Sequence, residues 1–359
     1  MDLKDKNLYY VGGVVRDEIL NSPSIDIDFC YEGNVIEFAE NLNIIKTNPE
    51  FGTVRVLTEN GEIDIASTRT ETYPKVGHLP IINKIGCSLK EDLSRRDFTI
   101  NALAKNTLSG EITDHFNGLE DIKNKKLRVL HEKSFIDDPS RIIRGLKFAI
   151  RFNFELAEDT QKLQEKYLEN INYDMSFHRI KKEIKETFNL NSQKALERFI
   201  NQGIYKLLGK EQSIPNIKTN IENLVKEFQP KHTWLVYAGL FNLSNFELTK
   251  EEAEIITQYQ KIKNIIPQND FESYNLYSNL PAESILLYAI TAETDIALKY
   301  LRELSFIKIS TSGNDLKELG LKEGKIYKDV FNSLIKEKLT HPNFTKQDEL
   351  NFIKENFLS

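Results

Sequence analysis

The chain changes its residue pattern near position 130, and this change limits the folds open to it. Before that point, short β-like runs such as residues 8–11 alternate with helix and turn signals. After it, strand signals almost vanish, and amphipathic segments such as 139–152 and 176–188 follow one another through Phe357. The pattern predicts an α+β fold: an N-terminal head with a small mixed or antiparallel sheet, followed by an all-helical region.

Within the head, residues 8–11 and 25–31 are predicted strands, separated by a Gly12-Gly13 turn and a short helix at 14–20. Two further strands, 53–57 and 62–67, flank a hairpin signal at Glu59-Asn60-Gly61. The pattern turns helical over 98–104. Four prolines are expected in loops between the later helices: Pro215, Pro230, Pro267 and Pro281.

Composition excludes several classes of protein. The 359 residues can form two or more domains with a sizeable core. Lys and Arg total 48 against 54 Asp and Glu, so the net charge of −6 gives no general attraction to nucleic acid, and RNA binding would need local basic patches. Cys30 and Cys87 are the only cysteines, no apolar run reaches transmembrane length, and the start is charged, so we expect a cytoplasmic protein that does not enter a membrane.

Two aspartates in the second predicted strand are candidate metal ligands. Asp26 and Asp28 are two residues apart, so a strand would point both carboxylates to one face. Neighbouring carboxylates repel unless a cation lies between them, and Mg²⁺ prefers oxygen ligands. Asp64, in the alternating run 62–66, is a candidate third carboxylate. The alternative is that these aspartates simply form the solvated face of a sheet.

The Gly12-Gly13 turn is a candidate phosphate site. Glycine permits positive φ and a close approach of the backbone to a ligand, and the helix start that follows directs free N–H groups toward an anion. Arg16 adds a fixed cation, and Asp17 is expected to anchor a neighbouring arginine or the turn itself. An ordinary strand-to-helix turn is the alternative. Together with the aspartates, this turn suggests a protein that handles a nucleoside triphosphate with Mg²⁺.

Two later segments make the pattern specific: Arg-Arg-Asp-Phe-Thr-Ile-Asn-Ala-Leu-Ala at 95–104 and Asp-Asp-Pro-Ser-Arg-Ile-Ile-Arg at 137–144. With the glycine turn and the aspartate pair, they resemble the class II tRNA nucleotidyltransferase / poly(A) polymerase family. The resemblance runs from Tyr9 to about Phe154 and continues more weakly at 176–180.

The resemblance implies roles for individual residues. In that family the paired carboxylates bind Mg²⁺, which here implies Asp26 and Asp28, and the second arginine of the Arg-Arg-Asp run contacts the nucleotide, which implies Arg96. Asp97 and Asn101 would organise the ribose side of the site. The alternative is a surface arginine pair with Asp97 as a helix N-cap.

The base-reading pair of the family falls on Asp138 and Arg141, with Arg144 nearby. Asp accepts hydrogen bonds and Arg donates them, which matches the amine and ring nitrogen shared by cytosine and adenine and rejects the reverse pattern of uracil and guanine. Alternatively, Asp138 caps a helix that starts at Pro139, and the arginines form a solvated face. The sequence departs from the family where Lys147 replaces a frequent arginine, because lysine lacks the bidentate fork.

The resemblance implies template-independent addition of CMP and AMP to tRNA 3′ ends, from CTP and ATP with Mg²⁺. It divides the chain into a nucleotidyltransferase head (1–130), a helical neck that recognises the base (131–190), and a helical body and tail that bind the tRNA acceptor arm (191–359). No protein partner is indicated. A loop predicted at 73–80 lies where the family uses a flexible element in switching from C to A.

Several related activities remain open at this point: a CC-adding or A-adding specialist, a poly(A) polymerase, or a non-catalytic RNA-binding relative. The intact Asp26/Asp28 pair argues against the last of these.

Overall fold

The computed structural model describes residues 3–23, 27–59, 61–292 and 294–358, with the side chain of residue 294 left out. The chain forms two compact units. The first comprises residues 1–212 and 242–246, and the second comprises 213–241 and 247–359. The first unit contains both the predicted head and the predicted neck, and the boundaries at 130 and 190 remain predictions.

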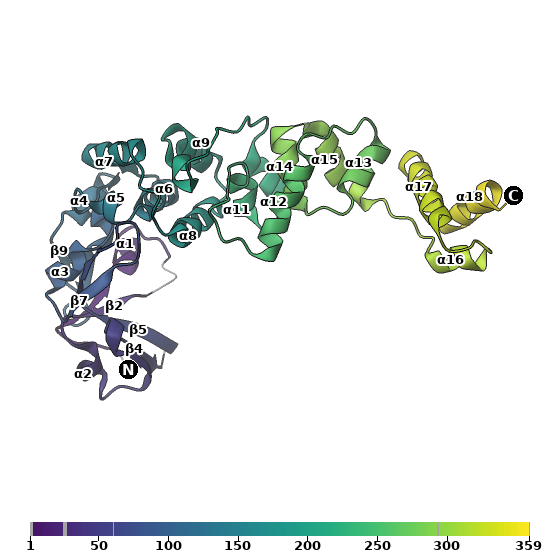
Figure 1. Cartoon of the computed structure of the whole chain (residues 1–359). Coiled ribbons are helices and arrows are strands. Elements are labelled where there is room, and N and C mark those ends of the chain that lie inside the picture. Colours follow the sequence, from purple (N-terminus) through teal and green to yellow (C-terminus); the bar gives the residue numbers. More distant parts are fainter. Residues whose placement is uncertain (1–2, 24–26, 60, 293, 359) are drawn as a thin grey trace. The chain divides into compact units, whose positions relative to one another are not determined.

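The strands of the first unit are β1 (Leu8–Val11), β2 (Phe29–Tyr31), β3 (Ile44–Asn48), β4 (Thr53–Thr58), β5 (Gly61–Ser67), β6 (Arg69–Thr72), β7 (Ile81–Ile85), β8 (Leu103–Asn106), β9 (Ile112–Asp114), β10 (Lys126–Leu127) and β11 (Glu155–Leu156). Seven of them form one sheet in the order β3-β4-β5-β2-β1-β8-β9 (Figure 1). Within it β2 and β5 are parallel and the other neighbours antiparallel, so the predicted mixed sheet is confirmed.

Two local predictions in the head need correction. The strand predicted over 25–31 is observed at Phe29–Tyr31, preceded by Ile27 and Asp28 outside the strand, while 24–26 lie outside the described residues. The helix predicted over 98–104 is wrong. A single 3₁₀ turn (Thr99–Asn101) leads directly into β8, because β8 pairs on one side with β1 and on the other with β9.

The helices of the first unit are α1 (Gly13–Ile19), α2 (Val35–Ala39), α3 (Leu89–Ser94), α4 (Gly118–Lys123), α5 (Ser134–Asp137), α6 (Ser140–Phe152), α7 (Glu158–Glu169), α8 (Phe177–Phe188) and α9 (Gln193–Asn201), with 3₁₀ turns at Pro49–Phe51, Thr99–Asn101 and Ile204–Leu208. Helix α6 is the central one for the site. It buries Ile142, Ile143 and Leu146 on one face, and it packs against α8 and α9. It ends at Asn153, whose left-handed backbone closes the last turn.

Glycine within α6 lets that helix lie close to the head. A Cβ at Gly145 would come within 3.1 Å of the Phe98 ring, which is fully buried beside it. Phe98 follows the Arg-Arg-Asp run, so this contact joins the helix to the segment that contains Arg96 and Asp97. The sequence predicted α6 and α8 within one residue of their observed bounds.

The helices of the second unit are α10 (Ile221–Phe228), α11 (Thr233–Ala238), α12 (Lys250–Ile262), α13 (Asp270–Tyr277), α14 (Ala282–Thr291), α15 (Thr294–Arg302), α16 (Gly313–Glu318), α17 (Lys325–Thr340) and α18 (Lys346–Phe357), with a 3₁₀ turn at Leu304–Phe306. The described residues of this unit form helices and loops, as predicted. Helix α14 is buried on all sides and packs against α11, α12 and α15, while α16–α18 share a small core around Leu316 and Leu334.

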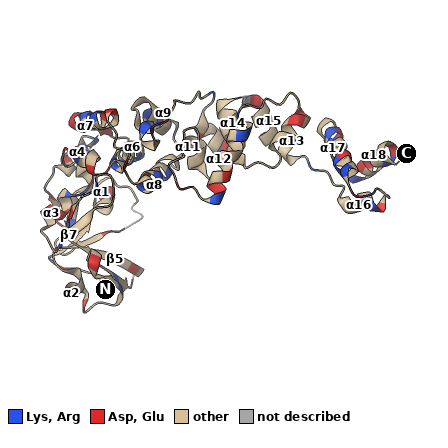
Figure 2. Ribbon diagram, viewed as in Figure 1, with Lys and Arg blue, Asp and Glu red and all other residues tan. Residues whose placement is uncertain are grey.

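Acidic and basic side chains are interspersed on the helices of this second unit, for example along α12 and α17 (Figure 2). The mixture agrees with the nearly balanced composition of the chain. Among the described residues, none of the helices combines the length and apolar character needed to cross a bilayer.

Candidate active site

A cavity of about 590 Å³ opens within the first unit, between the sheet end of the head and helices α6 and α8. Its wall brings together ten of the residues predicted from the sequence: Gly12, Gly13, Arg16, Asp28, Arg96, Asp97, Asn101, Asp138, Arg141 and Arg144. These positions are spread over more than 130 residues of sequence, so the fold assembles them.

The glycine turn and Arg96 face each other on one side of this cavity. Gly12 has a φ of +70°, and a Cβ there would lie 2.7 Å from Arg96 Nη1, so a side chain at this position would collide with the guanidinium. Arg96 binds Asp92 through Nη2 at 3.2 Å, and its buried Nε has no hydrogen-bond partner within the described part of the chain. Arg96 therefore places an incompletely paired cation against the turn.

Asp28 lies on the same side, one residue before β2. Its side chain is exposed, and its carbonyl accepts a hydrogen bond from the N–H of Val11 at 3.1 Å, next to the glycine turn. Asp26 lies outside the described residues, so the predicted alignment of the two carboxylates remains a prediction.

Asp64 is held away from the cavity wall. Both of its carboxylate oxygens accept hydrogen bonds from Arg55 of β4, at 2.8 and 2.7 Å, and its side chain is 63% exposed. The hydrogen bonds from Arg55 hold the pKa of Asp64 below its ordinary value. The parallel register of β2 and β5 pairs Phe29 with Ile65. Asp28 and Asp64 each precede one of these two residues, but the Asp64 carboxylate is bound to Arg55.

Arg16 lies in the cavity wall but is almost fully buried, 4% exposed. Its Nε and Nη2 bind Asp17 at 2.8 and 2.6 Å, and its Nη1 donates to the side-chain oxygen of Asn101. Asp17 thus anchors a neighbouring arginine, as predicted. The predicted contact of Arg16 with a triphosphate is untested by these bonds.

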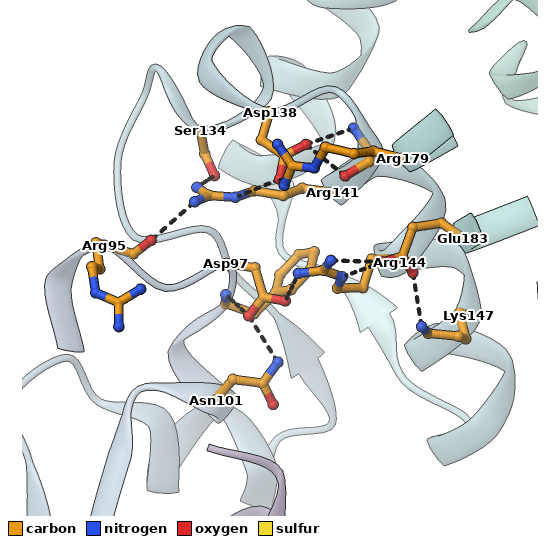
Figure 3. A network of polar contacts seen from close by, with 12 residues as sticks. Arg95, Asp97, Asn101, Ser134, Asp138, Arg141, Arg144, Lys147, Arg179 and Glu183 are labelled. Carbon is orange, nitrogen blue, oxygen red and sulfur yellow. Dashed lines mark hydrogen bonds and ion pairs between the residues drawn. The ribbon is translucent and has the colours of Figure 1, made fainter. Parts of the chain in front are cut away.

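A chain of polar contacts connects Asn101 to α6 and α8 (Figure 3). Asn101 donates to Asp97 Oδ1 at 2.8 Å, and Arg144 donates to Asp97 Oδ2 at 3.1 Å. Glu183 of α8 accepts from Arg144 at 2.6 Å and from Lys147 at 2.8 Å. The predicted basic face of α6 is therefore paired with acids in the interior.

These contacts shift the pKa values of the acids. Burial alone would raise the pKa of Asp97, but Arg144 and the hydrogen bond from Asn101 outweigh it and leave the pKa below its ordinary value. Burial opposes the charge of Glu183 in the same way, and Arg144 and Lys147 again lower the pKa. Both acids are thus charged near neutral pH.

Asp138 and Arg141 form a buried pair at the start of α6, 2% and 3% exposed (Figure 3). Asp138 Oδ1 accepts from the N–H and hydroxyl of Ser140 at 3.1 and 2.5 Å. The helix-capping alternative placed the helix start at Pro139, but α6 begins at Ser140 with Pro139 as its N-cap. Arg141 donates to the Ser134 hydroxyl at 2.7 Å and to the Arg95 carbonyl at 2.9 Å. Its Nε lies 3.8 Å from Asp138 Oδ2.

Arg179 of α8 joins this pair to the loop at 73–80. It donates to Asp138 Oδ2 through Nη2 and to the carbonyl of His78 through Nη1 at 3.1 Å. The loop is docked by two further backbone hydrogen bonds, from the Gly77 N–H to the Asp137 carbonyl and from the Ser176 N–H to the Gly77 carbonyl. The segment is a loop, as predicted, and it connects β6 and β7, while its predicted mobility is untested.

Sequence reasoning missed the roles of Arg179 and Glu183. The available signal was their spacing of four residues, which places them on one side of a predicted amphipathic helix beside the buried Ile180 and Ile184. An arginine and a glutamate on the buried side of a helix indicate buried partners elsewhere in the fold. The structure was needed to identify those partners, which lie on α6, at Asp138 just before it, and in the loop at 73–80.

The arrangement has two chemically different ends. One carries a glycine turn, a cation and an exposed carboxylate, which suits phosphate groups and a hard cation. The other carries a fixed acceptor and a fixed donor, which suits the edge of a heterocyclic base. A molecule with a base at one end and phosphates at the other fits this chemistry.

Comparisons with known proteins agree with this chemistry. Residues 8–128 match the model of the poly A polymerase head domain. The A-adding tRNA nucleotidyltransferase of Halalkalibacterium halodurans is 31% identical over 98% of this chain and 89% of its own length. That of Aquifex aeolicus is 47% identical, over 43% of this chain and 20% of its own length. The CCA-adding enzyme of Streptococcus thermophilus is 38% identical, over 47% of this chain and 43% of its own length.

Solved structures show the same relationship. A CCA-adding enzyme in an apo form has a TM-score of 0.80 and 25% identity, covering 98% of this chain and 92% of its own. The Thermotoga maritima CCA-adding enzyme complexed with tRNA has a TM-score of 0.75 and 26% identity, covering 97% and 90%. With a relative above 30% identity along nearly the whole length, the chain belongs to the tRNA nucleotidyltransferase / poly(A) polymerase family of enzymes.

Proposed function

We propose that this protein adds CMP and AMP to the 3′ end of tRNA without a nucleic-acid template, using CTP and ATP with Mg²⁺. One observation supports this proposal most directly. The buried Asp138/Arg141 pair lies in the wall of the same cavity as the glycine turn and Asp28. A base-selecting end and a phosphate end therefore belong to one site.

The base is selected by side chains that are already fixed. Asp138 accepts from the exocyclic amine, and Arg141 donates to the adjacent ring nitrogen, a combination that cytosine and adenine share. Uracil and guanine present a carbonyl and a ring N–H in the reverse order, so each would leave a buried charged group without its partner. The bonds of Arg141 to Ser134 and Arg95 keep its guanidinium in one orientation for this task.

The phosphate end receives the triphosphate through the backbone at Gly12 and Gly13 and through Arg96. Asp97, Asn101 and Arg144 orient the sugar and the base-reading helix. In the transfer, the tRNA 3′-hydroxyl oxygen bonds to the α-phosphorus as the bond from that phosphorus to the bridging oxygen breaks, and pyrophosphate leaves.

The carboxylate of Asp28 fits a Mg²⁺ site, because it is exposed on the cavity wall beside the glycine turn and offers oxygen ligands. Asp26, two residues earlier, would be its companion, and Asp64 would join them only after release from Arg55. When bound, Mg²⁺ supplies activation of the attacking hydroxyl and stabilisation of the departing pyrophosphate.

The helical region from 191 to 359 is the proposed binding surface for the tRNA acceptor arm. RNA duplexes are recognised mainly by shape and by phosphate and 2′-hydroxyl contacts, which suits a surface with interspersed cations. The Thermotoga maritima relative, solved in complex with tRNA, supports tRNA as the partner.

A-adding activity alone is the second candidate. Two A-adding relatives match 98% and 96% of this chain, whereas the Streptococcus thermophilus CCA-adding enzyme matches 47%. Both candidates use ATP on a tRNA that already ends in CC, and the Asp138/Arg141 pair serves either one. Only the use of CTP separates them.

The test uses two tRNAs, one ending before its CC and one ending after it, each with Mg²⁺ and labelled CTP or ATP. Incorporation of CMP on the first and AMP on the second supports CCA addition. AMP incorporation alone establishes the A-adding specialist, and CMP incorporation alone establishes the CC-adding one. Runs of many AMP residues would identify a poly(A) polymerase, and no incorporation of either nucleotide would refute the enzymatic proposal.

A further inference from the structure

Arg16 connects two elements that are far apart in the sequence. It projects from α1, directly after the glycine turn, and its guanidinium lies over two aromatic rings of α6, 5.1 Å from the Phe148 centroid and 4.6 Å from that of Phe152. The residue is 4% exposed. These distances are within the range of cation–π attraction.

The polar edge of the same guanidinium is bonded to the head. Nε and Nη2 bind Asp17, and Nη1 donates to Asn101. Arg151 of α6 also binds Asp17, with its Nη2 donating to Asp17 Oδ2 at 3.2 Å. We call this set of six residues the Arg16 junction: Arg16, Asp17, Asn101, Phe148, Arg151 and Phe152.

The junction continues into the network that reaches the base-reading end. Asn101 binds Asp97, and Asp97 binds Arg144, which lies seven residues before Arg151 on α6 (Figure 3). Seven residues are about two helical turns. The head therefore holds α6 at two points along its length, and the same helix begins beside Asp138 and Arg141.

Arg16 and Arg96 differ in the burial of their guanidinium groups and in the contacts that these groups make. Arg96 is 18% exposed in its side chain, forms an ion pair with Asp92, and has a buried Nε without a hydrogen-bond partner among the described residues. Arg16 is more deeply buried, is bound to two head residues, and lies over two rings. The geometry suits Arg96 to an arriving phosphate and Arg16 to holding the structure together.

We propose that Arg16 is a positioning residue, which sets the base-reading helix α6 against the glycine turn and so contributes to the choice of base. This inference rests on the proposed function and assigns to Arg16 a role different from contact with the triphosphate. A phosphate contact would be shared by every nucleotide, because the triphosphate is the same in all of them. A change in the position of α6 acts differently on correct and incorrect bases.

The experiment compares Arg16→Lys, Phe152→Leu and the double variant with the unaltered full-length protein. The measured quantity is the ratio of kcat/KM for ATP to that for GTP on a tRNA ending in CC. Lysine retains the charge but cannot bind Asp17 and Asn101 with a planar fork. We expect the ratio to fall by at least about tenfold in each single variant, since small displacements near reacting groups are costly.

The double variant tests whether the two side chains act together. Residues in contact give non-additive effects, so the double variant should lose little more discrimination than the worse single variant. Arg96→Lys is the matched control. It should lower kcat/KM for ATP and GTP by similar factors and leave their ratio unchanged.

Equal losses for ATP and GTP in Arg16→Lys, with additive effects of Phe152→Leu, would overturn the proposal in favour of a triphosphate contact. Thermal unfolding identifies a variant that fails to fold. If Arg16→Lys fails to fold, the ratio for ATP and GTP is measured with Phe152→Leu, which replaces the ring by a smaller apolar side chain. If the unaltered protein transfers no nucleotide, the proposed function fails separately. The ratio of equilibrium affinities for ATP and GTP then tests the junction without turnover.

Discussion

The two ends of the cavity are built in opposite ways. At the proposed base-reading end, Asp138 and Arg141 are almost fully buried and are held by Ser140, Ser134 and Arg179. At the phosphate end, Asp28 is exposed and stands just outside a three-residue strand. If the proposed function holds, the difference teaches that folding fixes the side chains proposed to read the base, whereas the proposed reacting end takes its final form with its ligands.

The energetic reasons for this difference are general. A buried ion pair costs desolvation and does not by itself stabilise a fold. We therefore propose that the Asp138/Arg141 pair serves the selection of the base. An exposed carboxylate has no such cost, and its oxygens are ligands of the kind that Mg²⁺ prefers. The following predictions test this contrast, from the largest expected effect to the smallest.

Asp28→Ala should have the largest effect on transfer and a small one on folding. We expect kcat to fall by more than about 100-fold, the loss that follows removal of a single charge-stabilising group from an active site. Because the side chain is exposed, the unfolding midpoint should stay within experimental error, and tRNA binding should remain measurable. Glu62→Gln, an exposed acid of the same sheet, is the control. Substantial transfer by Asp28→Ala would refute the metal role.

Asp138→Ala should affect both discrimination and stability, in contrast to Asp28→Ala. Its removal takes the acidic partner Asp138 from the buried Arg141 and the half-buried Arg179, and breaking a buried pair costs about 3–5 kcal/mol of unfolding free energy. Residual transfer should no longer separate ATP from GTP or CTP from UTP. Chemical denaturation and single-nucleotide incorporation measure the two effects. A stable variant with unchanged discrimination would contradict the base-reading role.

Glu183→Gln tests the network behind the base-reading end through its pH dependence. Burial opposes the charge of Glu183, but Arg144 and Lys147 hold the pKa below the ordinary value of about 4.3. A lowered folded-state pKa means that the carboxylate stabilises the fold above the unfolded value, and that this stability is lost as pH falls through the folded value.

Glu183→Gln should therefore unfold more easily than the unaltered protein above about pH 5. The difference should shrink as pH falls below the ordinary glutamate pKa, because the unfolded chain takes up a proton there before the folded carboxylate does. Urea denaturation at several pH values measures this. A difference that does not change with pH would show that the pair with Arg144 contributes nothing through its charge.

The sequence predicted the grouping of Asp138, Arg141 and Arg144 better than the surroundings of these residues, for a physical reason. Residues 137–144 lie on one helix, so local spacing places Asp138, Arg141 and Arg144 together. Local spacing also predicted β1, the pair β4 and β5, and the helices α6 and α8. Patterns of this kind depend on neighbours within a few residues.

Long-range pairing accounts for what the sequence could not predict. Leu103 and Ala104 were assigned to a helix from their spacing, but both lie in β8, between strands that come from residues 8–11 and 112–114. The partners of Glu183 and Arg179 lie between 36 and 101 residues away in the chain. The sequence could not predict that Arg16 lies buried over two rings of α6, because those rings are also far away in the chain.

Gly77→Ala should loosen the docked loop that touches the base-reading end through Arg179 and His78. Gly77 has a φ of +75°, which costs an L-residue about 1–2 kcal/mol, and a new Cβ would lie 2.8 Å from that of Met175. We expect a change in the ratio of AMP to CMP incorporation of only a few fold. Gly110→Ala is the matched control, because its φ is +74° and its Cβ would meet nothing within 4 Å. Equal behaviour of both variants would show that the Met175 contact is unimportant.

Asp64→Asn should have the smallest effect, although Asp64 belongs to the phosphate end by strand register. Both of its oxygens are occupied by Arg55, and it lies largely in solvent. We expect transfer to fall by no more than about tenfold, the lower end of the range for groups that support metal ligands from outside. Arg55→Ala sharpens the test, because it releases Asp64 without removing its charge. If Asp64→Asn were as inactive as Asp28→Ala, and if Arg55→Ala lowered the Mg²⁺ concentration needed for half-maximal transfer, Asp64 would be a third metal ligand. In that case folding alone would already bring Asp64 close to Asp28, and the exposed end of the cavity would differ less from the buried end than its contacts indicate.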